Sequence, residues 1–387
     1  MTRDLTLRYT AIQSFYWMGF ATISGFASVF LLAMGFSNTR IGFIMAISGL
    51  VSAAVQPIAA TLAEGEGRTS LKSLLYGIGG LVTVLGLGLT ALSQMGGPAV
   101  LVGLLYGGSL FLLHLAQPLI NATGTEALNH GQRLNWGLAR GIGSASYAAI
   151  ACVLGFLTDR VGCVSIPVMI AVSFGGLTLC LTAFPFAKSG GRGTEQGATT
   201  PLAFFQKYPR FAVLLVGAVL LFTGHTILNS FNFQIVQSKG GGSGEMGIAA
   251  ALSACYELPT MFFFALMSKR IRCDTWMRVA GVFFTLKAAA TWLAPNVPVF
   301  LGIQVFQMLG FGLVAVASVH YINAIMNQED AIKGQAYFTV TMTLGTVLGA
   351  LMGGAMLDRF GVDAVLACIS AVSLTGTLIL CASTQRT

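Results

Sequence analysis

Charged residues are scarce in this sequence: only 9% of its 387 residues are Asp, Glu, Lys or Arg, whereas 55% are hydrophobic. A soluble globular chain carries about 25% charged residues, so the composition excludes an ordinary soluble domain. It indicates a protein that crosses a membrane several times. The net charge of +8 comes from basic residues spread over short loops, and we therefore expect no nucleic-acid partner.

Patterns that bind metals or carry out catalysis are also missing. The seven Cys residues are scattered without ligand spacing, and the four His residues lie far apart and form no metal set. No Ser-His-Asp or Cys-His arrangement is supported by spacing. The Gly-rich segment 240–247 (GGGSGEMG) lacks the Lys-Ser/Thr ending of a phosphate-binding loop. We expect no cofactor, no metal and no enzymatic activity.

Long apolar runs are what the sequence has in abundance. A membrane-crossing helix needs about 20 apolar residues, and such runs occur at 9–34, 39–63, 72–94, 98–121, 136–158, 165–187, 210–235, 246–268, 276–295, 298–326, 334–357 and 363–383. The polar, Gly-rich stretch 188–209 reads as a linker. We predict an all-α membrane protein with twelve transmembrane helices in two pseudo-symmetric six-helix bundles, at 1–187 and 210–387.

Two similar strings lie nearly half the chain apart and support this division. They read GFLTDRVG at 155–162 and GAMLDRFG at 354–361. Each ends an apolar run and precedes another, so the self-match predicts two related halves in the same order. Two such bundles can rock against each other around a central site, which makes transport the leading hypothesis.

The distribution of basic residues predicts the orientation. Most of the 21 Lys and Arg residues fall on the side that holds both termini, whereas Arg40, Arg160, Lys239 and Arg359 fall on the opposite side. Basic loops stay in the cytoplasm. We therefore expect a multi-pass protein of the cell (inner) membrane with both termini cytoplasmic.

Polar residues recur at helical spacing on several apolar segments, as they do on helices that line a water-filled cavity. The alternative is that these side chains only bond neighbouring helices. The stripes are His114, Gln117 and Asn121 on the fourth segment, Arg140, Ser144 and Tyr147 on the fifth, His225, Asn229 and Asn232 on the seventh, Gln304 and Gln307 on the tenth, and Gln13, Tyr16 and Trp17 on the first. We predict that they contribute to a solute site between the halves.

Charges inside apolar segments are a sharper signal, because each costs about 2.5–3.5 kcal/mol at a helix centre. Glu257 lies midway along the eighth segment and Lys287 near the middle of the ninth, and the two are candidates for an ion pair. Glu257 is the candidate for proton coupling. Arg140 lies about one turn inside the fifth segment and Glu126 just past the fourth, so these two are a second candidate pair, with interfacial snorkelling as the alternative.

These residues resemble the major facilitator superfamily, in particular its lactose-permease-like proton symporters, over essentially the whole chain. Residues 135–147 (NWGLARGIGSASY) are similar to the family's fifth-helix pattern. The resemblance implies that Arg140 binds substrate, that Tyr147 stacks on a sugar ring and that Glu126 partners the arginine. Residues 256–264 (YELPTMFFF) and 285–292 (TLKAAATW) resemble the eighth and ninth helices, which implies functional roles for Glu257 and Lys287.

Two regions of the sequence depart from the pattern of that branch. Its tenth helix carries a His and a Glu for proton handling, where this sequence has Gln307 and Gly310. The loop motif after the second helix is degenerate, with Glu64 or Glu66 as candidate replacements for its acidic residue.

The expected function is secondary active transport of a sugar or nucleoside-like solute by alternating access, coupled to protons through Glu257 and Lys287. An organic anion symporter or exchanger, with Arg140 and Lys287 facing a carboxylate, and a sugar or drug efflux carrier are the alternatives. A membrane-embedded enzyme or a receptor is not supported, because the sequence shows neither a catalytic set of residues nor an appended soluble domain. The expected partners are the solute, protons and the lipid bilayer, and the expected oligomeric state is a monomer.

Overall fold

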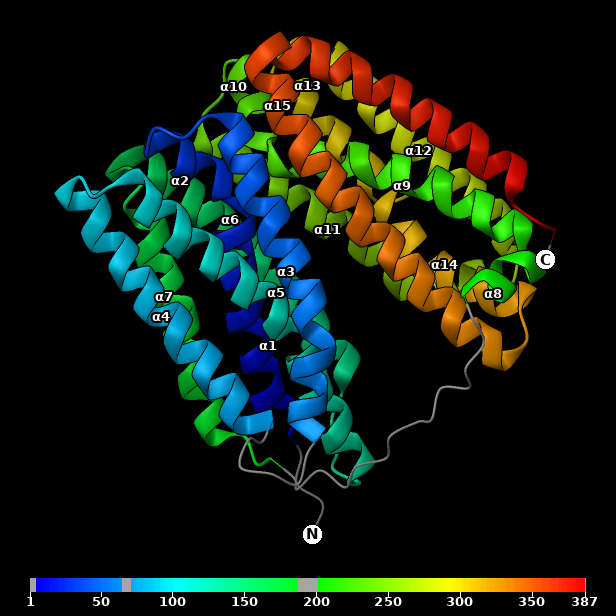
Figure 1. Ribbon diagram of the computed structural model, residues 1–387, viewed down its shortest axis with the longest axis horizontal. Coiled ribbons are helices and arrows are strands. Elements are labelled where there is room, and N and C mark those ends of the chain that lie inside the picture. Colours follow the sequence, from blue (N-terminus) through cyan, green and yellow to red (C-terminus); the bar gives the residue numbers. More distant parts are fainter. Residues whose placement is uncertain (1–4, 65–70, 187–200, 387) are drawn as a thin grey trace. The chain divides into compact units, whose positions relative to one another are not determined.

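The computed structural model describes residues 5–64, 71–186 and 201–386, and throughout these ranges the chain forms helices and no β-strands (Figure 1). The all-α fold class is confirmed. The chain divides into two compact units. Unit 1 comprises Met1–Thr194 and Gly242–Ala251, and unit 2 comprises Glu195–Gly241 and Leu252–Thr387. Residues 188–200 of the expected linker, the position of Glu66 and the side chain of Glu64 lie outside the described part.

Unit 1 holds the first six membrane segments. Its helices are α1 (Thr6–Phe20), a π-helical stretch (Ala21–Gly25), α2 (Ala27–Ala33), α3 (Asn38–Glu64), α4 (Leu71–Met95), α5 (Ala99–Asn129), α6 (Trp136–Val161) and α7 (Ser165–Ala183). The first turns of α11 (Ser243–Met267), up to Ala251, also group with unit 1.

Unit 2 holds the remaining segments. They are α8 (Pro201–Lys207), α9 (Pro209–Ser230), α10 (Asn232–Ser238), the rest of α11, α12 (Cys273–Leu293), α13 (Val297–Ile303), a 3₁₀ turn (Gln304–Gln307), α14 (Phe311–Ile325) and α15 (Gln328–Ser383). The helix α8 occupies a stretch that the sequence analysis assigned to the linker.

The number of membrane crossings agrees with the prediction of twelve. Nine helices in the described ranges are each long and apolar enough to cross a bilayer, and the bent pair α1–α2 makes ten. Helix α15 has 56 residues, which at 1.5 Å per residue is far longer than one crossing of a core about 30 Å thick. Its backbone leaves helical geometry at Gly361, so it supplies two crossings. Helix α12 is the twelfth, and its Asp274, Arg278 and Lys287 explain its lower apolarity.

Three segments that the sequence predicted as continuous helices are broken. The first bends by 47° between the π-helical stretch and α2, because the extra residue of the π turn and the non-helical φ of Phe26 (−101°) interrupt the regular ladder. The seventh is interrupted at Phe231, between α9 and α10. The tenth leaves the α-helix from Gln304 to Gly310, where Gly310 has φ −89° and ψ −101°.

The backbone confirms the repeat that the two Asp-Arg strings predicted. Gly162 has φ 93° and ψ 177°, and Gly361 has φ 75° and ψ 178°. Both values lie in a region that only glycine occupies readily. The packing repeats as well: α1 packs on α6 and α4 on α7, and likewise α9 and α12 each pack on α15. Two helix contacts of unit 1 therefore recur in unit 2.

Small residues bring α9 and α15 together, and the two run side by side in Figure 1. A Cβ atom at Gly345 would lie 2.5 Å from Cβ of Phe222, and one at Gly349 would lie 2.7 Å from the carbonyl oxygen of Thr223. The next glycine along this face, Gly353, meets Phe231 in the same way. Without large side chains the two backbones approach closely, as in other membrane helix pairs.

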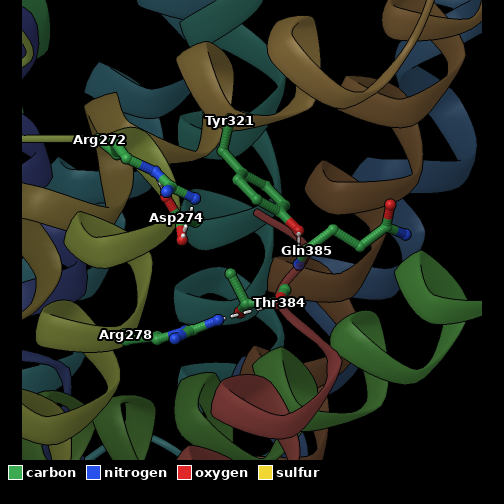
Figure 2. Close-up of polar contacts among 6 residues, drawn as sticks. All are labelled: Arg272, Asp274, Arg278, Tyr321, Thr384 and Gln385. Carbon is green, nitrogen blue, oxygen red and sulfur yellow. Dashed lines mark hydrogen bonds and ion pairs between the residues drawn. The ribbon is translucent and has the colours of Figure 1, made fainter. Parts of the chain in front are cut away.

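One end of unit 2 is fastened by polar contacts. Figure 2 shows the guanidinium of Arg272 against the carboxylate of Asp274, with Nε–Oδ1 and Nη2–Oδ2 distances of 2.9 and 3.0 Å. In the same view, Arg278 donates to the carbonyl of Thr384 (3.1 Å), and the backbone N–H of Gln385 donates to the Tyr321 hydroxyl (2.8 Å). These bonds tie the end of α15 to α12 and α14.

Helix α8 is held at the start of α15. Lys207 Nζ donates to Asp330 Oδ2 at 2.6 Å, and the Tyr208 hydroxyl donates to the same oxygen at 2.9 Å. The hydrogen bond to Asp330 raises the pKa of the Lys207 amine, so this lysine stays protonated at neutral pH. The contact fixes the end of α8 to the start of α15.

Candidate functional site

In unit 1, a half-buried cation lies on an aromatic ring where α1 packs against α6. The guanidinium carbon Cζ of Arg140 stands 3.8 Å from the centre of the Trp17 ring. Arg140 Nη1 also donates to Ser144 Oγ, one turn further along α6, at 2.7 Å. Gly143 makes room for the ring, because a Cβ at that position would lie 2.7 Å from Trp17 Cδ1. The negative face of the indole stabilises the cation, by about 2 kcal/mol when desolvated.

The Trp17 ring is held in place by a chain of hydrogen bonds along one face of α1. Trp17 Nε1 donates to Gln13 Oε1 (3.0 Å), Gln13 Nε2 donates to the Tyr9 hydroxyl (2.8 Å), and that hydroxyl donates to the carbonyl of Ile120 on α5 (3.2 Å). The residues are spaced by four, so they share one helix face. The chain fixes the orientation of the platform beneath Arg140.

The expected pairing of Glu126 with Arg140 stays a prediction. The Arg140 guanidinium lies over Trp17 and bonds Ser144. Glu126 is half-buried near the end of α5, where its backbone carbonyl accepts from His130. The sequence spacing did not reveal the stacked ring and the hydroxyl that contact this cation.

The other predicted residues of unit 1 surround the same helices. Tyr16 is buried and donates to the carbonyl of Leu113 at 3.3 Å. The Phe20 ring contacts two of these residues: its centroid lies 6.2 Å from that of the His114 ring and 6.5 Å from that of the Tyr147 ring. Gln117 and Asn121 follow His114 along α5 at turn spacing and are half-buried.

In unit 2, a small pocket lies beside the broken tenth segment. Aromatic rings and polar groups line it together: His225 and Leu228 of α9, Phe283, Phe284 and Lys287 of α12, Phe306, Gln307, Gly310 and Phe311 of the broken segment, and Ser373 of α15. The lining combines apolar walls with few polar groups, as small-molecule sites do, while the free space of about 10 Å³ is that of one water molecule.

Lys287 and Glu257 are connected through an amide. Lys287 Nζ donates to Gln307 Oε1 at 2.6 Å, and Gln307 Nε2 donates to Glu257 Oε1 at 2.7 Å. Lys287 and Gln307 are only 6% and 3% exposed. Both predicted charges are therefore brought together, with Gln307 placed between them. Hydrogen bonds to ionised groups are roughly twice as strong as neutral ones.

The second glutamine of the broken segment has neutral partners. Gln304 Oε1 accepts from Ser253 Oγ (2.9 Å), and Gln304 Nε2 donates to the carbonyl of Phe300 (3.0 Å). The carbonyl of Met308, released by the break, accepts from Thr260 Oγ1 at 2.8 Å. Side chains of α11 thus satisfy groups that the irregular backbone would otherwise leave unpaired in the membrane. The contacts of Gln304 are those of helix packing.

The seventh segment contributes an imidazole to the pocket. The His225 ring stacks on Phe311, with centroids 4.6 Å apart and planes 5° apart, and meets Phe284 edge-on. Asn229 follows one turn later. Its side-chain Nδ2 lies 3.0 Å from His225 Nε2 and donates to the backbone carbonyl of His225 at 2.9 Å. Asn232 begins α10, and its side-chain oxygen is buried with no hydrogen-bond partner among the described residues. Buried polar atoms are normally paired, so Asn232 is a candidate ligand of a bound group.

Sequence reasoning missed the contact between Trp17 and Arg140 and the aromatic part of the unit 2 cluster. Trp17 and Gln13 appeared only as members of a stripe, and their spacing of four was the available signal. Nothing in the sequence singles out Phe306, Phe311 or Ser373, because 27 Phe residues are scattered through apolar runs. No cluster of His, Cys, Asp or Glu in the described part of the chain is arranged to hold a metal ion.

Comparisons with known proteins point to one family. The family model described as "MFS_1 like family" matches residues 9–367. A maltose permease of Geobacillus stearothermophilus is 26% identical in a match covering 98% of this chain and 95% of that protein. A putative sugar efflux transporter of Deinococcus radiodurans is also 26% identical, but its match covers 42% of this chain and 41% of that protein.

Solved structures share the fold. The nucleoside transporter NupG superimposes with a TM-score of 0.81 at 14% sequence identity, covering 99% of this chain and all of that chain. A D-xylose-proton symporter superimposes with a TM-score of 0.73 at 12% identity, covering 99% and 98% of the two chains. The helical arrangement inferred from the sequence is therefore the arrangement of known membrane transporters.

Proposed function

Because this chain belongs to the MFS_1-like family of the major facilitator superfamily, whose members are transporters and not enzymes, we propose that it carries a sugar or nucleoside-like solute by alternating access, in symport with protons. The observation that carries this proposal is the pocket of unit 2, where four Phe rings adjoin His225, Lys287, Gln307 and Ser373. The names of the relatives, a maltose permease and a putative sugar efflux transporter, support the solute class.

The chemistry of the two clusters suits a polyhydroxylated solute. Sugar rings and nucleobases have apolar faces that pack on aromatic rings, and their hydroxyls exchange hydrogen bonds with amides and charged groups. In unit 1 the guanidinium of Arg140 is fixed over Trp17, and a guanidinium donates forked hydrogen bonds to paired oxygens. In this proposal each cluster binds hydroxyls through its cation and ring faces through its aromatic residues.

Proton coupling is assigned to Glu257. Its hydrogen bond from Gln307 places it one amide away from Lys287, and a carboxylate inside a membrane segment is by default a functional group. In this proposal the protein lies in the cell (inner) membrane with both termini in the cytoplasm, because most basic residues fall on the side that holds the termini. The working unit is a monomer.

The decisive experiment measures uptake into proteoliposomes that hold the purified protein. The panel contains radiolabelled maltose, D-xylose, uridine and lactate, with an inward proton gradient imposed. We expect accumulation of at least one of the first three solutes, and collapse of that accumulation to the equilibrium level when a protonophore dissipates the gradient. Accumulation that persists without the gradient would refute proton coupling, and movement of none of the three would refute the solute class.

An organic anion carrier is the second candidate, and one observation favours it. Arg140 lies on α6 and Lys287 on α12, both within apolar segments of the sequence, and Lys287 lines the pocket. If lactate alone is carried, this candidate replaces the first. Export, the direction in the name of the Deinococcus relative, is distinguished by repeating the assay with outward gradients.

A further inference from the structure

We propose that Gln307 is a positioning residue: its side-chain amide holds Lys287 and Glu257 in one network and links occupancy of the pocket to the protonation of Glu257. The proposal rests on the proposed function, because it explains how the same site would connect solute and proton. It concerns a position where a non-titratable side chain stands between two ionisable ones.

The geometry leaves the amide a single orientation. Its oxygen faces the ammonium group of Lys287 at 2.6 Å, and its nitrogen faces the carboxylate of Glu257 at 2.7 Å. Reversing the amide would place its N–H groups against an ammonium group and its oxygen against a carboxylate, and both contacts would be repulsive. The three groups therefore form one polarised chain that spans α12, the broken tenth segment and α11.

The backbone around Gln307 is built to present this amide. The segment is a 3₁₀ turn from Gln304 to Gln307, and the α-helix resumes only at Phe311. Glycine allows α11 to come close, because a Cβ at Gly312 would lie 3.1 Å from the Cα of Glu257. A continuous α-helix with a larger residue at 312 would keep α11 further from the amide.

The pocket adjoins one end of this chain. Lys287 and Gln307 line it, and Glu257 is joined to them through the amide nitrogen. His225 of α9 also lines the pocket and is a further titratable group that faces Lys287. A solute hydroxyl that accepts a hydrogen bond from Lys287 competes with the amide oxygen. The amide then turns or shifts, and the hydrogen bond to Glu257 changes with it.

Gln304 provides a matched control. It lies in the same 3₁₀ turn and is equally buried, at 3% exposed, but both of its hydrogen bonds go to neutral groups, Ser253 and the Phe300 carbonyl. Replacing either glutamine by Met keeps the length of the side chain and removes the amide. Only the change at position 307 should depend on charge.

The first test is a thermal-unfolding cycle on the purified full chain, which needs no solute. Gln307→Met and Gln304→Met are each measured in the wild type and in a background with Glu257→Gln and Lys287→Met. We expect Gln307→Met to lower the unfolding temperature clearly in the wild type and much less in the neutral background, because no buried charge then loses its partner. Gln304→Met should lower it equally in both. Equal losses from Gln307→Met in both backgrounds would overturn the bridge.

The second test measures the ratio of protons to solute with a pH dye enclosed in proteoliposomes, after addition of maltose, D-xylose or uridine. We expect the ratio to fall in Gln307→Met and in Gln307→Asn, whose amide is one methylene too short to reach both charges. Gln304→Met should keep the wild-type ratio whatever its rate. An unchanged ratio in both Gln307 variants would overturn the positioning role. If the wild-type protein moves no protons with any of the three solutes, the proposed function fails, and the unfolding cycle alone decides whether the bridge exists.

Discussion

At the scale of single residues, a guanidinium inside a membrane segment needs partners that replace water. Arg140 obtains them from a ring and a hydroxyl, with its Cζ 3.8 Å above Trp17 and its Nη1 2.7 Å from Ser144. The ring is useful only because Gln13 and Tyr9 hold it at the right angle. Trp17, which the sequence indicated only as a member of a polar stripe, therefore controls where the charge of Arg140 lies.

Substitutions of Trp17 test this control. Trp17→Phe keeps a ring face but loses the hydrogen bond to Gln13, whereas Trp17→Leu loses both. We expect both variants to unfold at lower temperature, with Trp17→Leu destabilised by about 0.5–2 kcal/mol more than Trp17→Phe, because a half-buried cation–π contact lies between the exposed and the desolvated case. Thermal unfolding of the purified protein gives the order. If the two variants are equally stable, the aromatic face of residue 17 contributes nothing to holding Arg140, and the prediction fails.

At the scale of helices, unit 2 combines a closely packed helix pair with an irregular segment that lines the pocket. The α9–α15 pair uses glycines where a side chain would collide, and it forms a closely packed part of unit 2. The tenth segment instead gives up its α-helix between Gln304 and Gly310 and places two glutamines and the pocket there. Irregular backbone is tolerated inside a membrane only where protein groups satisfy it, as Thr260 does for Met308.

A substitution in this closely packed pair tests its tightness. Gly349→Ala would place a Cβ 2.7 Å from the Thr223 carbonyl oxygen and 2.8 Å from Thr226 Cβ. The helices must move apart, and we expect a loss of about 1–3 kcal/mol in the free energy of unfolding. Gly302→Ala is the control within unit 2, because no atom lies within 4 Å of its Cβ position. That variant should be neutral or gain up to about 1 kcal/mol from higher helix propensity. A loss of the same size in both variants would contradict the packing argument.

At the scale of the whole molecule, composition and repetition predicted most of the fold. Apolar runs of bilayer length located the helices, and the Asp-Arg strings located the repeat, because length and spacing are physical requirements that any bilayer imposes. The breaks at Phe231 and at Gln304–Gly310 were not predicted, since neither contains a proline, and polar residues at helical spacing were taken as one face of a continuous helix. The Gln307 bridge was missed for a related reason: the sequence showed two charges and an amide, but their contact depends on a 3₁₀ turn that periodicity does not reveal.

The duplication makes a prediction that concerns both halves at once. Asp159, within the first string, accepts hydrogen bonds from the backbone N–H groups of Ser243 (3.0 Å) and Gly244 (2.7 Å), and so caps the start of α11. The string ends at Gly162, and its counterpart ends at Gly361. Both glycines have positive φ with ψ near 180°, a conformation that costs any other residue about 1–3 kcal/mol.

Ala at either glycine should therefore destabilise the protein by a similar amount, about 1–3 kcal/mol. Neither position offers a competing explanation from packing, because no atom lies within 4 Å of the Cβ that Ala would add. Thermal unfolding of Gly162→Ala, Gly361→Ala and the double variant measures the two effects and their sum. Two effects of similar size that add in the double variant would mean that each half of the chain relies on the same turn independently. A large loss at one position and none at the other would mean that the similarity of the two strings does not extend to their role in folding.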